Sequence, residues 1–408
     1  MKTSLDWRRA VALLALAAAP LSAADTDRLK VDADVTLKRL PNGLTYYIRQ
    51  NKKPENRAQF RLVVNAGSIL ETEKQRGLAH FVEHMAFNGT QNFQKHELVN
   101  FLERIGMQFG ADLNAYTSFD ETVYQLEIPM DKADVLEKAI QILEEWAHQI
   151  TFDPLEIEKE RGVVVEEWRT GRGAQGRLMD KQFPVLFNQS LYATRLPIGL
   201  TNILLTADRS QFLDFYHKWY RPDLMAVVAV GDFDAKQIEA MIINHFGKLK
   251  NPDDAPPRPA PMVPDHPETL FSIETDPELS TTSVEIACKH PVSTSGTAAD
   301  YRRDLVNSLF SGMLDQRLGE RVQEANPPYL QAGVGKMRMV RVKEMAIQHA
   351  AVKEGLFAEG LKALLLESRR ARRDGFTRAE FDRAKTQWLR GMERAFEERN
   401  KTDRKSVV

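Results

Sequence analysis

Apolar and polar positions follow two different periods along the first 250 residues. Residues 59–65 and 225–230 are rich in β-branched and small apolar side chains and predict strands. Residues 95–105 and 135–150 repeat apolar side chains every three or four positions and predict helices with one buried face. The turn signal at residues 40–44 predicts a β-hairpin at the start of this region.

The same patterns predict further elements on both sides of a proline-rich stretch. Before it, the additional expected elements are strands at 112–118 and 122–128 and helices at 155–168 and 210–219. Residues 251–267 hold many prolines and few aliphatic residues, which predicts a semi-rigid linker. After it, we expect strands at 270–272 and 282–289, a helix at 299–324, a strand-rich stretch to 352, and helices at 357–373 and 378–398.

Strands followed by helices in each half predict an α+β fold. We expect two consecutive homologous units, each a mainly antiparallel sheet with helices packed on one face. The expected domains are residues 28–250 and 268–402, joined by the linker at 251–267. A chain of 408 residues is long enough for two such cores.

The first residues predict export. Basic residues precede an apolar run at 10–21, and small residues follow it, as in a secretory signal peptide spanning residues 1–24. The run is short for a permanent membrane anchor. We therefore expect an exported protein, in the periplasm or alternatively outside the cell.

Cys288 is the single cysteine, so no internal disulfide can form. A net charge of −1 favours neither nucleic acid nor an anionic membrane as a partner.

One short stretch, His80-Phe81-Val82-Glu83-His84, carries candidate metal chemistry. Residues four apart lie on one helix face, one turn apart, so His80 and His84 point to the same side. Two imidazoles beside a carboxylate suit a hydrolytic zinc site, which uses neutral nitrogen ligands and a base next to the reacting water. The competing explanation is two incidental histidines, but the chain has only nine, so chance rarely produces this spacing.

A catalytic zinc ion needs a third protein ligand. The helix predicted at 155–168 carries glutamates at positions 156, 158, 160, 166 and 167. Glu160 and Glu167 lie seven positions apart, which is two turns, and share a face with apolar neighbours. The other three fit an exposed helix surface. The residues alone leave Glu160 and Glu167 as open alternatives.

Four segments together resemble the pitrilysin/insulinase family of zinc metallopeptidases, which includes mitochondrial processing peptidase. These segments are residues 80–90, 113–118, 160–167 and 216–232. The likeness extends over about residues 35–398 and is stronger in the first domain. It implies a LuxS/mitochondrial-processing-peptidase-like metallohydrolase fold whose second domain is inactive.

The resemblance also implies roles for individual residues. His80 and His84 would be ligands of one zinc ion, and Glu83 would be the general base. Glu167 would be the third ligand, and Glu160 an acid that orients a ligand. The separation from His84 to Glu167 is longer than is usual in the family, and Glu160 falls closer to the usual separation. Residues Asn114, Ala115 and Tyr116 match the edge strand on which family members bind substrate.

The implied function is a zinc-dependent endopeptidase that hydrolyses peptides or unfolded polypeptides. The alternative is a catalytically idle scaffold or partner subunit, which would be expected to have a broken motif. Family members close a chamber with a second peptidase-like half, in the same chain or as a partner subunit, so we expect such a half as a partner. We also expect the second domain to be incomplete, the natural chain to continue, and residues 403–408 to be a non-native tail.

Overall fold

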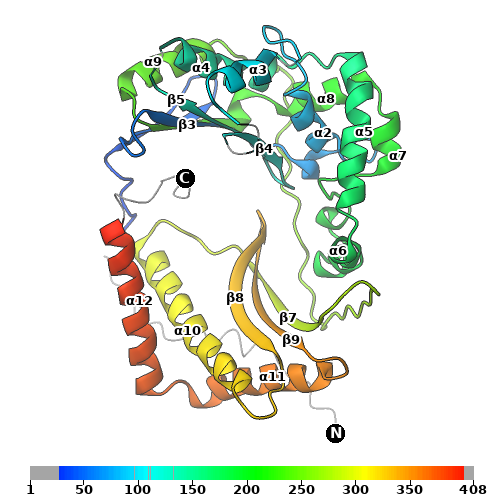
Figure 1. Ribbon diagram of the computed structural model, residues 1–408, viewed down its shortest axis with the longest axis vertical. Coiled ribbons are helices and arrows are strands. Elements are labelled where there is room, and N and C mark those ends of the chain that lie inside the picture. The colour runs from blue at the N-terminus through cyan, green and yellow to red at the C-terminus, as the bar shows by residue number, and fades with distance from the viewer. Residues whose placement is uncertain (1–26, 96, 109, 111, 132, 399–408) are drawn as a thin grey trace. The chain divides into compact units, whose positions relative to one another are not determined.

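The structure is a computed structural model that describes residues 27–95, 97–108, 110, 112–131 and 133–398 (Figure 1). It contains two compact units, which we call the N-terminal unit (Asp32–Pro277) and the C-terminal unit (residues 278–398 together with 27–31). The predicted signal peptide and the predicted tail at 403–408 lie outside the described residues. In the described part of the chain, no helix has the length and apolar content needed to cross a membrane.

The N-terminal unit is built on a six-stranded sheet with the order β1-β2-β6-β3-β5-β4. The strands are β1 (Val35–Arg39), β2 (Thr45–Gln50), β3 (Arg57–Val64), β4 (Leu113–Thr117), β5 (Thr122–Pro129) and β6 (Met225–Gly231). All pairings are antiparallel except that of β2 with β6. The expected hairpin and the mainly antiparallel sheet are therefore confirmed.

Helices pack on this sheet because alternate strand residues are apolar. In β3 every second residue is buried, from Ala58 to Val64. Contacts join α2 to β4 and β5, α4 to β3 and β5, and α9 to β2, and Figure 1 shows α4 and α9 lying together beside the strands. The helices are α2 (Leu78–Met85), α3 (Glu97–Arg104), α4 (Ala133–His148), α5 (Pro154–Thr170), α6 (Ala174–Leu186), α7 (Thr201–Thr206), α8 (Arg209–Trp219) and α9 (Ala235–Phe246).

Three of these helices were not predicted, for different reasons. Helix α6 contains Pro184, a residue that usually ends or interrupts a helix, and buries no residue fully. Helix α7 is only six residues long. Helix α9 does carry a signal, because Ile238, Ile242 and Phe246 repeat every four positions and are buried. The strand predicted at 270–272 is wrong: the segment belongs to no strand, and Phe271 is exposed.

The C-terminal unit has a three-stranded antiparallel sheet with the order β7-β9-β8. Its elements are β7 (Thr282–Pro291), α10 (Ala298–Val322), β8 (Gln331–Val340), β9 (Lys343–Val352), α11 (Phe357–Asp374) and α12 (Arg378–Glu398). Helix α10 contacts β8, helix α11 contacts β7 and β9, and Figure 1 shows α10 and α12 side by side. The core of this unit includes Leu318, Tyr329, Ala350 and Leu364.

The division between the units differs from the predicted boundaries at 28, 250 and 268. Residues 251–277 contain no helix or strand and belong with the N-terminal unit. Arg177 on α6 donates two hydrogen bonds of 2.7 Å to the carboxylate of Asp276, which ties this segment to that unit. Residues 27–31 join the C-terminal unit, where the Leu29 N–H donates to the Gly296 carbonyl at 2.8 Å.

Candidate metal centre and active site

Helix α2 places both motif histidines on one side, as its period requires. The Nε2 atoms of His80 and His84 lie 3.3 Å apart, with the two rings nearly perpendicular at 87°. This distance would suit a hydrogen bond between the two imidazoles alone. A third side chain, however, also approaches the same two nitrogens. The pair therefore belongs to a larger cluster.

Helix α5 supplies the third group. The Asp153 side chain accepts from the N–H groups of Leu155 and Glu156 and caps this helix, and Pro154 occupies its first turn. Two turns separate Glu160 from Glu167, and both face α2. The arrangement of these two acids around His84 decides what each can do.

The two glutamates contact opposite nitrogens of the His84 ring. Glu160 Oε1 lies 2.8 Å from His84 Nδ1, whereas Glu167 Oε2 lies 3.3 Å from His84 Nε2. Glu167 Oε1 also lies 3.6 Å from His80 Nε2. Ligand atoms of His80, His84 and Glu167 all fall within 4.8 Å of one another. The geometry thus brings Glu167, and not Glu160, to the side where the two histidines converge.

The donor set fits a zinc ion. Ligand atoms held about 2.1 Å from a tetrahedral ion lie roughly 3.4 Å from one another. The two imidazole nitrogens lie 3.3 Å apart, and each lies 3.3 or 3.6 Å from a different oxygen of the Glu167 carboxylate. Two imidazole nitrogens and one carboxylate oxygen are also ligand types that catalytic zinc uses, with one position left for water or substrate.

The histidines differ in their affinity for protons. Burial, together with the nearby His84, lowers the pKa of His80 to about 4, and its Nδ1 atom is buried without a hydrogen-bond partner in the described residues. Burial also opposes protonation of His84, but hydrogen bonds to Glu160 and Glu167 outweigh it and raise the pKa of His84 to about 9. The hydrogen bond to His84 lowers the pKa of Glu167. His80 is therefore neutral near pH 7 with a ring nitrogen available as a ligand, whereas the two glutamates favour positive charge at His84.

Glu83 lies next to this cluster with its carboxylate largely buried. Its Oε2 atom accepts a hydrogen bond of 2.6 Å from the Thr117 hydroxyl on β4. Burial raises the pKa of Glu83, and the hydrogen bond from Thr117 partly opposes that rise. A carboxylate with a raised pKa is a better proton acceptor near neutral pH.

Two features at the start of α2 hold the motif in place. The Glu71 carboxylate accepts hydrogen bonds from the N–H groups of Gly77 and Ala79, where the helix dipole favours negative charge. Gly77 has a φ of 103°, and a Cβ added there would lie 2.9 Å from the Cα of Gly199. A glycine is therefore needed at this position by both conformation and space.

A second residue supports Glu160. The side-chain amide of Asn88 donates to Glu160 Oε2 at 2.8 Å and to the His84 carbonyl at 3.1 Å. The hydrogen bonds from His84 and Asn88 outweigh the effect of burial and lower the pKa of Glu160, so this acid is ionised beside His84. Sequence reasoning missed the roles of Glu71, Asn88 and Thr117, because their contacts depend on folding and follow no short spacing rule.

The three residues predicted to bind substrate lie on β4, which is the last strand of the sheet and pairs with β5 alone among the described residues. Asn114 and Tyr116 are exposed, and Ala115 is half-buried. Their side chains are not part of the His80, His84 and Glu167 cluster.

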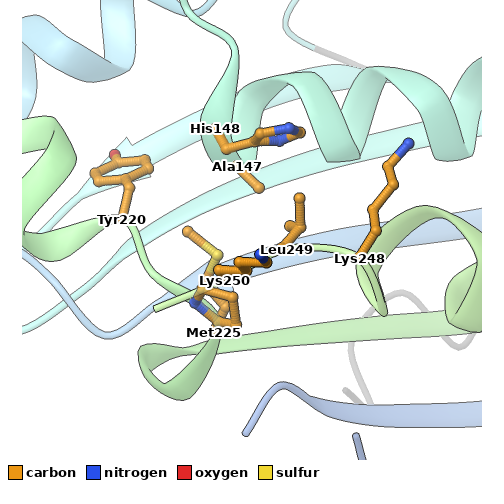
Figure 2. A pocket seen from close by; sticks show the side chains of 8 residues that line it. Ala147, His148, Tyr220, Met225, Lys248, Leu249 and Lys250 are labelled. Carbon is orange, nitrogen blue, oxygen red and sulfur yellow. The ribbon is translucent and has the colours of Figure 1, made fainter. Parts of the chain in front are cut away.

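A cavity of about 200 Å³ lies elsewhere in the N-terminal unit, between the end of α4 and the segment after α9 (Figure 2). Two of its polar side chains already have partners: Lys248 pairs with Glu144 at 2.8 Å, and Tyr220 bonds to Tyr124. No predicted site residue lines this cavity. Its lining is Ala147, His148, Tyr220, Pro222, Met225, Lys248, Leu249 and Lys250.

A sheet that carries a His-x-x-Glu-His helix opposite a glutamate helix defines a class of protein, the inverzincin metallopeptidases. Sequence comparison agrees with this class. Residues 46–176 match the family described as insulinase (peptidase family M16), and residues 206–388 match its M16 inactive domain. The chain belongs to peptidase family M16, the insulinase family.

Several known proteins are similar to this chain. A protein of Arabidopsis thaliana named zinc protease PQQL-like is 41% identical over 81% of the chain and 35% of that protein. The probable zinc protease PqqL of Escherichia coli is 30% identical over 92% of the chain and 40% of that protein. The crystal structure of the first half of the periplasmic protease PqqL from Escherichia coli is 28% identical, with a TM-score of 0.82 over 92% of this chain and 81% of that one. The chain thus spans about two-fifths or less of the curated relatives.

Proposed function

We propose that this chain is the zinc-binding part of an exported endopeptidase that hydrolyses peptides or unfolded polypeptides. The single observation that carries the proposal is the convergence of two imidazole nitrogens, 3.3 Å apart, with the Glu167 carboxylate, beside the buried carboxylate of Glu83. A structural cluster of histidines and acids would give Glu83 no task. Relatives named zinc proteases add support.

His80, His84 and Glu167 would hold one zinc ion. When bound, zinc polarises the scissile carbonyl and lowers the pKa of the attacking water. Glu160 and Asn88 would act through His84: the ionised carboxylate accepts from Nδ1–H, so Nε2 is the nitrogen that would give up its proton and bind the metal. Which nitrogen carries the proton follows from this contact, since a carboxylate only accepts.

Glu83 would carry the proton through the reaction. Its carboxylate takes a proton from water as the water oxygen forms a bond to the carbonyl carbon. The same carboxyl group then gives that proton to the departing amine nitrogen as the carbon–nitrogen bond breaks. The raised pKa of Glu83 suits both steps, because the group must accept and release a proton at a similar pH.

The edge strand β4 offers a place for the peptide. An unpaired strand edge can accept an added strand through main-chain hydrogen bonds, which tolerate many side-chain sequences. We assign substrate binding to Asn114, Ala115 and Tyr116 on this basis. Such binding suits unstructured polypeptides rather than one defined sequence.

A second peptidase-like half would complete the enzyme, in the same gene product or as a partner subunit. The similar crystal structure is named as the first half of a protease, and the curated relatives are more than twice as long as the matched region. That protease is periplasmic, and we propose the same location for this protein, with residues 1–24 as its signal peptide.

The test uses the full gene product, purified, depleted of metal and reloaded with zinc. We expect about one zinc per chain by elemental analysis, hydrolysis of an internally quenched unstructured peptide, and loss of both with a chelator. Glu83→Gln should keep the zinc and lower kcat by about 100-fold or more, since it removes only the proton acceptor. Undiminished hydrolysis by zinc-loaded Glu83→Gln, or wild-type protein that binds no zinc, would contradict the proposal. Glu166→Gln is the matched control on the exposed side of α5.

A further inference from the structure

The hydroxyl of Thr117 makes the closest polar contact to Glu83 that the structure describes. The distance from Thr117 Oγ1 to Glu83 Oε2 is 2.6 Å. This length is typical of a hydroxyl that donates to an ionised carboxylate, a stronger bond than one between neutral groups. The contact joins the edge strand β4 to the motif helix α2, two elements that also pack against each other.

The direction of this hydrogen bond follows from the neighbouring hydroxyl. Thr122 Oγ1 lies 2.9 Å from the Ala66 carbonyl oxygen, which can only accept, so Thr122 directs its proton there. Thr117 and Thr122 stand opposite each other in the β4–β5 ladder, with their hydroxyl oxygens 3.3 Å apart. The Thr117 proton is therefore left for Glu83.

The strand fixes the position of this donor. Because side chains alternate along a strand, Thr117 lies on the face opposite Tyr116 and points toward α2. A threonine has few χ1 rotamers on a strand, and its neighbours in the ladder restrict it further. A peptide that pairs with the main chain of β4 would leave this hydroxyl on Glu83.

We propose, on the basis of the function above, that Thr117 is the positioning residue for Glu83: its hydroxyl holds the carboxylate in the orientation that proton transfer needs. Glu83 sits on a helix with three rotatable side-chain bonds, and one directed donor selects among the resulting conformations. Thr117 does not touch the ligand atoms of His80, His84 or Glu167. Removing its hydroxyl should therefore slow the chemical step and leave zinc binding unchanged.

The test compares Thr117→Val with Thr117→Ser in the zinc-loaded full gene product. Valine keeps the shape and the strand preference of threonine but removes the donor. We expect Thr117→Val to lower kcat about 10-fold or more, because it removes a hydrogen bond that matters only while the proton is transferred. KM should stay within about twofold of wild type, and zinc content should not change. Thr117→Ser should restore most of kcat, since it keeps the hydroxyl.

A matched control exists in the same unit. The Thr90 hydroxyl donates to the buried Glu145 carboxylate at 2.5 Å, away from the ligand atoms. Thr90→Val should lower the unfolding temperature but leave kcat within about threefold of wild type, because it removes a comparable bond without touching Glu83.

Three outcomes would overturn the inference. Thr117→Val could keep kcat within about twofold of wild type while Glu83→Gln is inactive, which rejects positioning and leaves the proposed function intact. Thr117→Ser could lose as much activity as Thr117→Val. Finally, Thr117→Val and Thr117→Ala could both lose zinc or fail to fold. Thr117 would then be needed for the structure of the site and not for positioning Glu83. If wild-type protein does not hydrolyse peptide at all, the proposed function itself fails, and this inference fails with it.

Discussion

The two units repeat one arrangement with different chemistry at the same place. In each, a strand leads into a helix and two further strands follow, and the sheet orders β3-β5-β4 and β7-β9-β8 correspond. Helix α2, which follows β3, and helix α10, which follows β7, each contact a later helix through a cation and a carboxylate. In the N-terminal unit this is His84 with Glu160, and in the C-terminal unit it is Arg317 with Glu380.

The chemical difference between histidine and arginine gives the two contacts different possible roles, one reactive and one structural. Imidazole can give up its proton and bind a metal ion, whereas a guanidinium stays protonated and has no free electron pair to donate. Glu380 raises the pKa of Arg317 further, and the pKa of Glu380 falls to about 2. Arg317 also donates to the Gly375 carbonyl at 2.8 Å and lies over the Phe376 ring. The same contact therefore locks helices together in one unit and, under the proposed function, would prepare a metal ligand in the other.

The largest expected effect comes from making the N-terminal unit resemble the C-terminal one. His84→Arg can keep a contact with Glu160 but removes a ligand, so we expect zinc binding to disappear. At free zinc about 1,000 times its dissociation constant, wild type should gain roughly 4 kcal/mol of stability, and the variant should gain none. Calorimetric titration and thermal unfolding with and without zinc measure this. One zinc bound by the variant at wild-type affinity would show that His84 is not a ligand.

Breaking the structural contact is expected to have the next largest effect. Arg317→Met removes the charged partner of Glu380, which keeps only its Thr377 donors, and the donor to the Gly375 carbonyl, and we expect it to lower the free energy of unfolding by about 3 kcal/mol. Urea unfolding followed by circular dichroism measures this loss. Zinc stoichiometry should not change. A variant as stable as wild type would mean that the ion pair does not hold α10 to α12.

Removing the acid that supports His84 should have a smaller effect. Glu160→Gln can no longer accept the His84 Nδ1–H as an anion, and we expect zinc affinity to fall by about 10- to 100-fold while one ion still binds. Glu167→Gln should lose more, because it removes a ligand. Competition with a chelating dye ranks the variants, and Glu166→Gln should match wild type. A larger loss for Glu160→Gln than for Glu167→Gln would reverse the two assignments.

The smallest expected effect concerns His245, a histidine that lies between two carboxylates. His245 contacts Glu144 at 2.5 Å and Glu137 at 2.9 Å, both on α4, and Lys248 also pairs with Glu144. The hydrogen bond that His245 donates to Glu144 raises the pKa of His245. Its contribution to stability is therefore complete below the unfolded pKa of about 6.5 and is lost as the pH rises through the higher folded value.

His245→Gln should abolish that part of the pH dependence. Urea unfolding of metal-free protein between about pH 6 and pH 9 should show wild-type stability falling more steeply than that of the variant. Metal-free His84 contributes a similar slope in both proteins, so the difference isolates His245. Parallel curves would show that His245 is not held in its protonated form by Glu144.

Much of the fold could be predicted because it depends on local patterns. The alternation at 59–65 and the apolar run at 225–230 were sufficient for β3 and β6, and the apolar repeat at 135–150 for α4. Helix α6 was not predicted, since Pro184 lies within it and its residues bury little. The boundary after Pro277 also escaped prediction, because it depends on the contact between Arg177 and Asp276, nearly 100 residues apart.

The sequence by itself determined the pair of histidines and the face that Glu160 and Glu167 share, because a helix converts spacings of four and seven into neighbouring side chains. It could not decide which glutamate meets Nε2 and which meets Nδ1 of His84, since that depends on how α5 crosses α2. Only the tertiary structure brought Thr117 to Glu83, across 34 positions. Contacts between elements follow from packing of whole faces, and no short spacing in the chain records them.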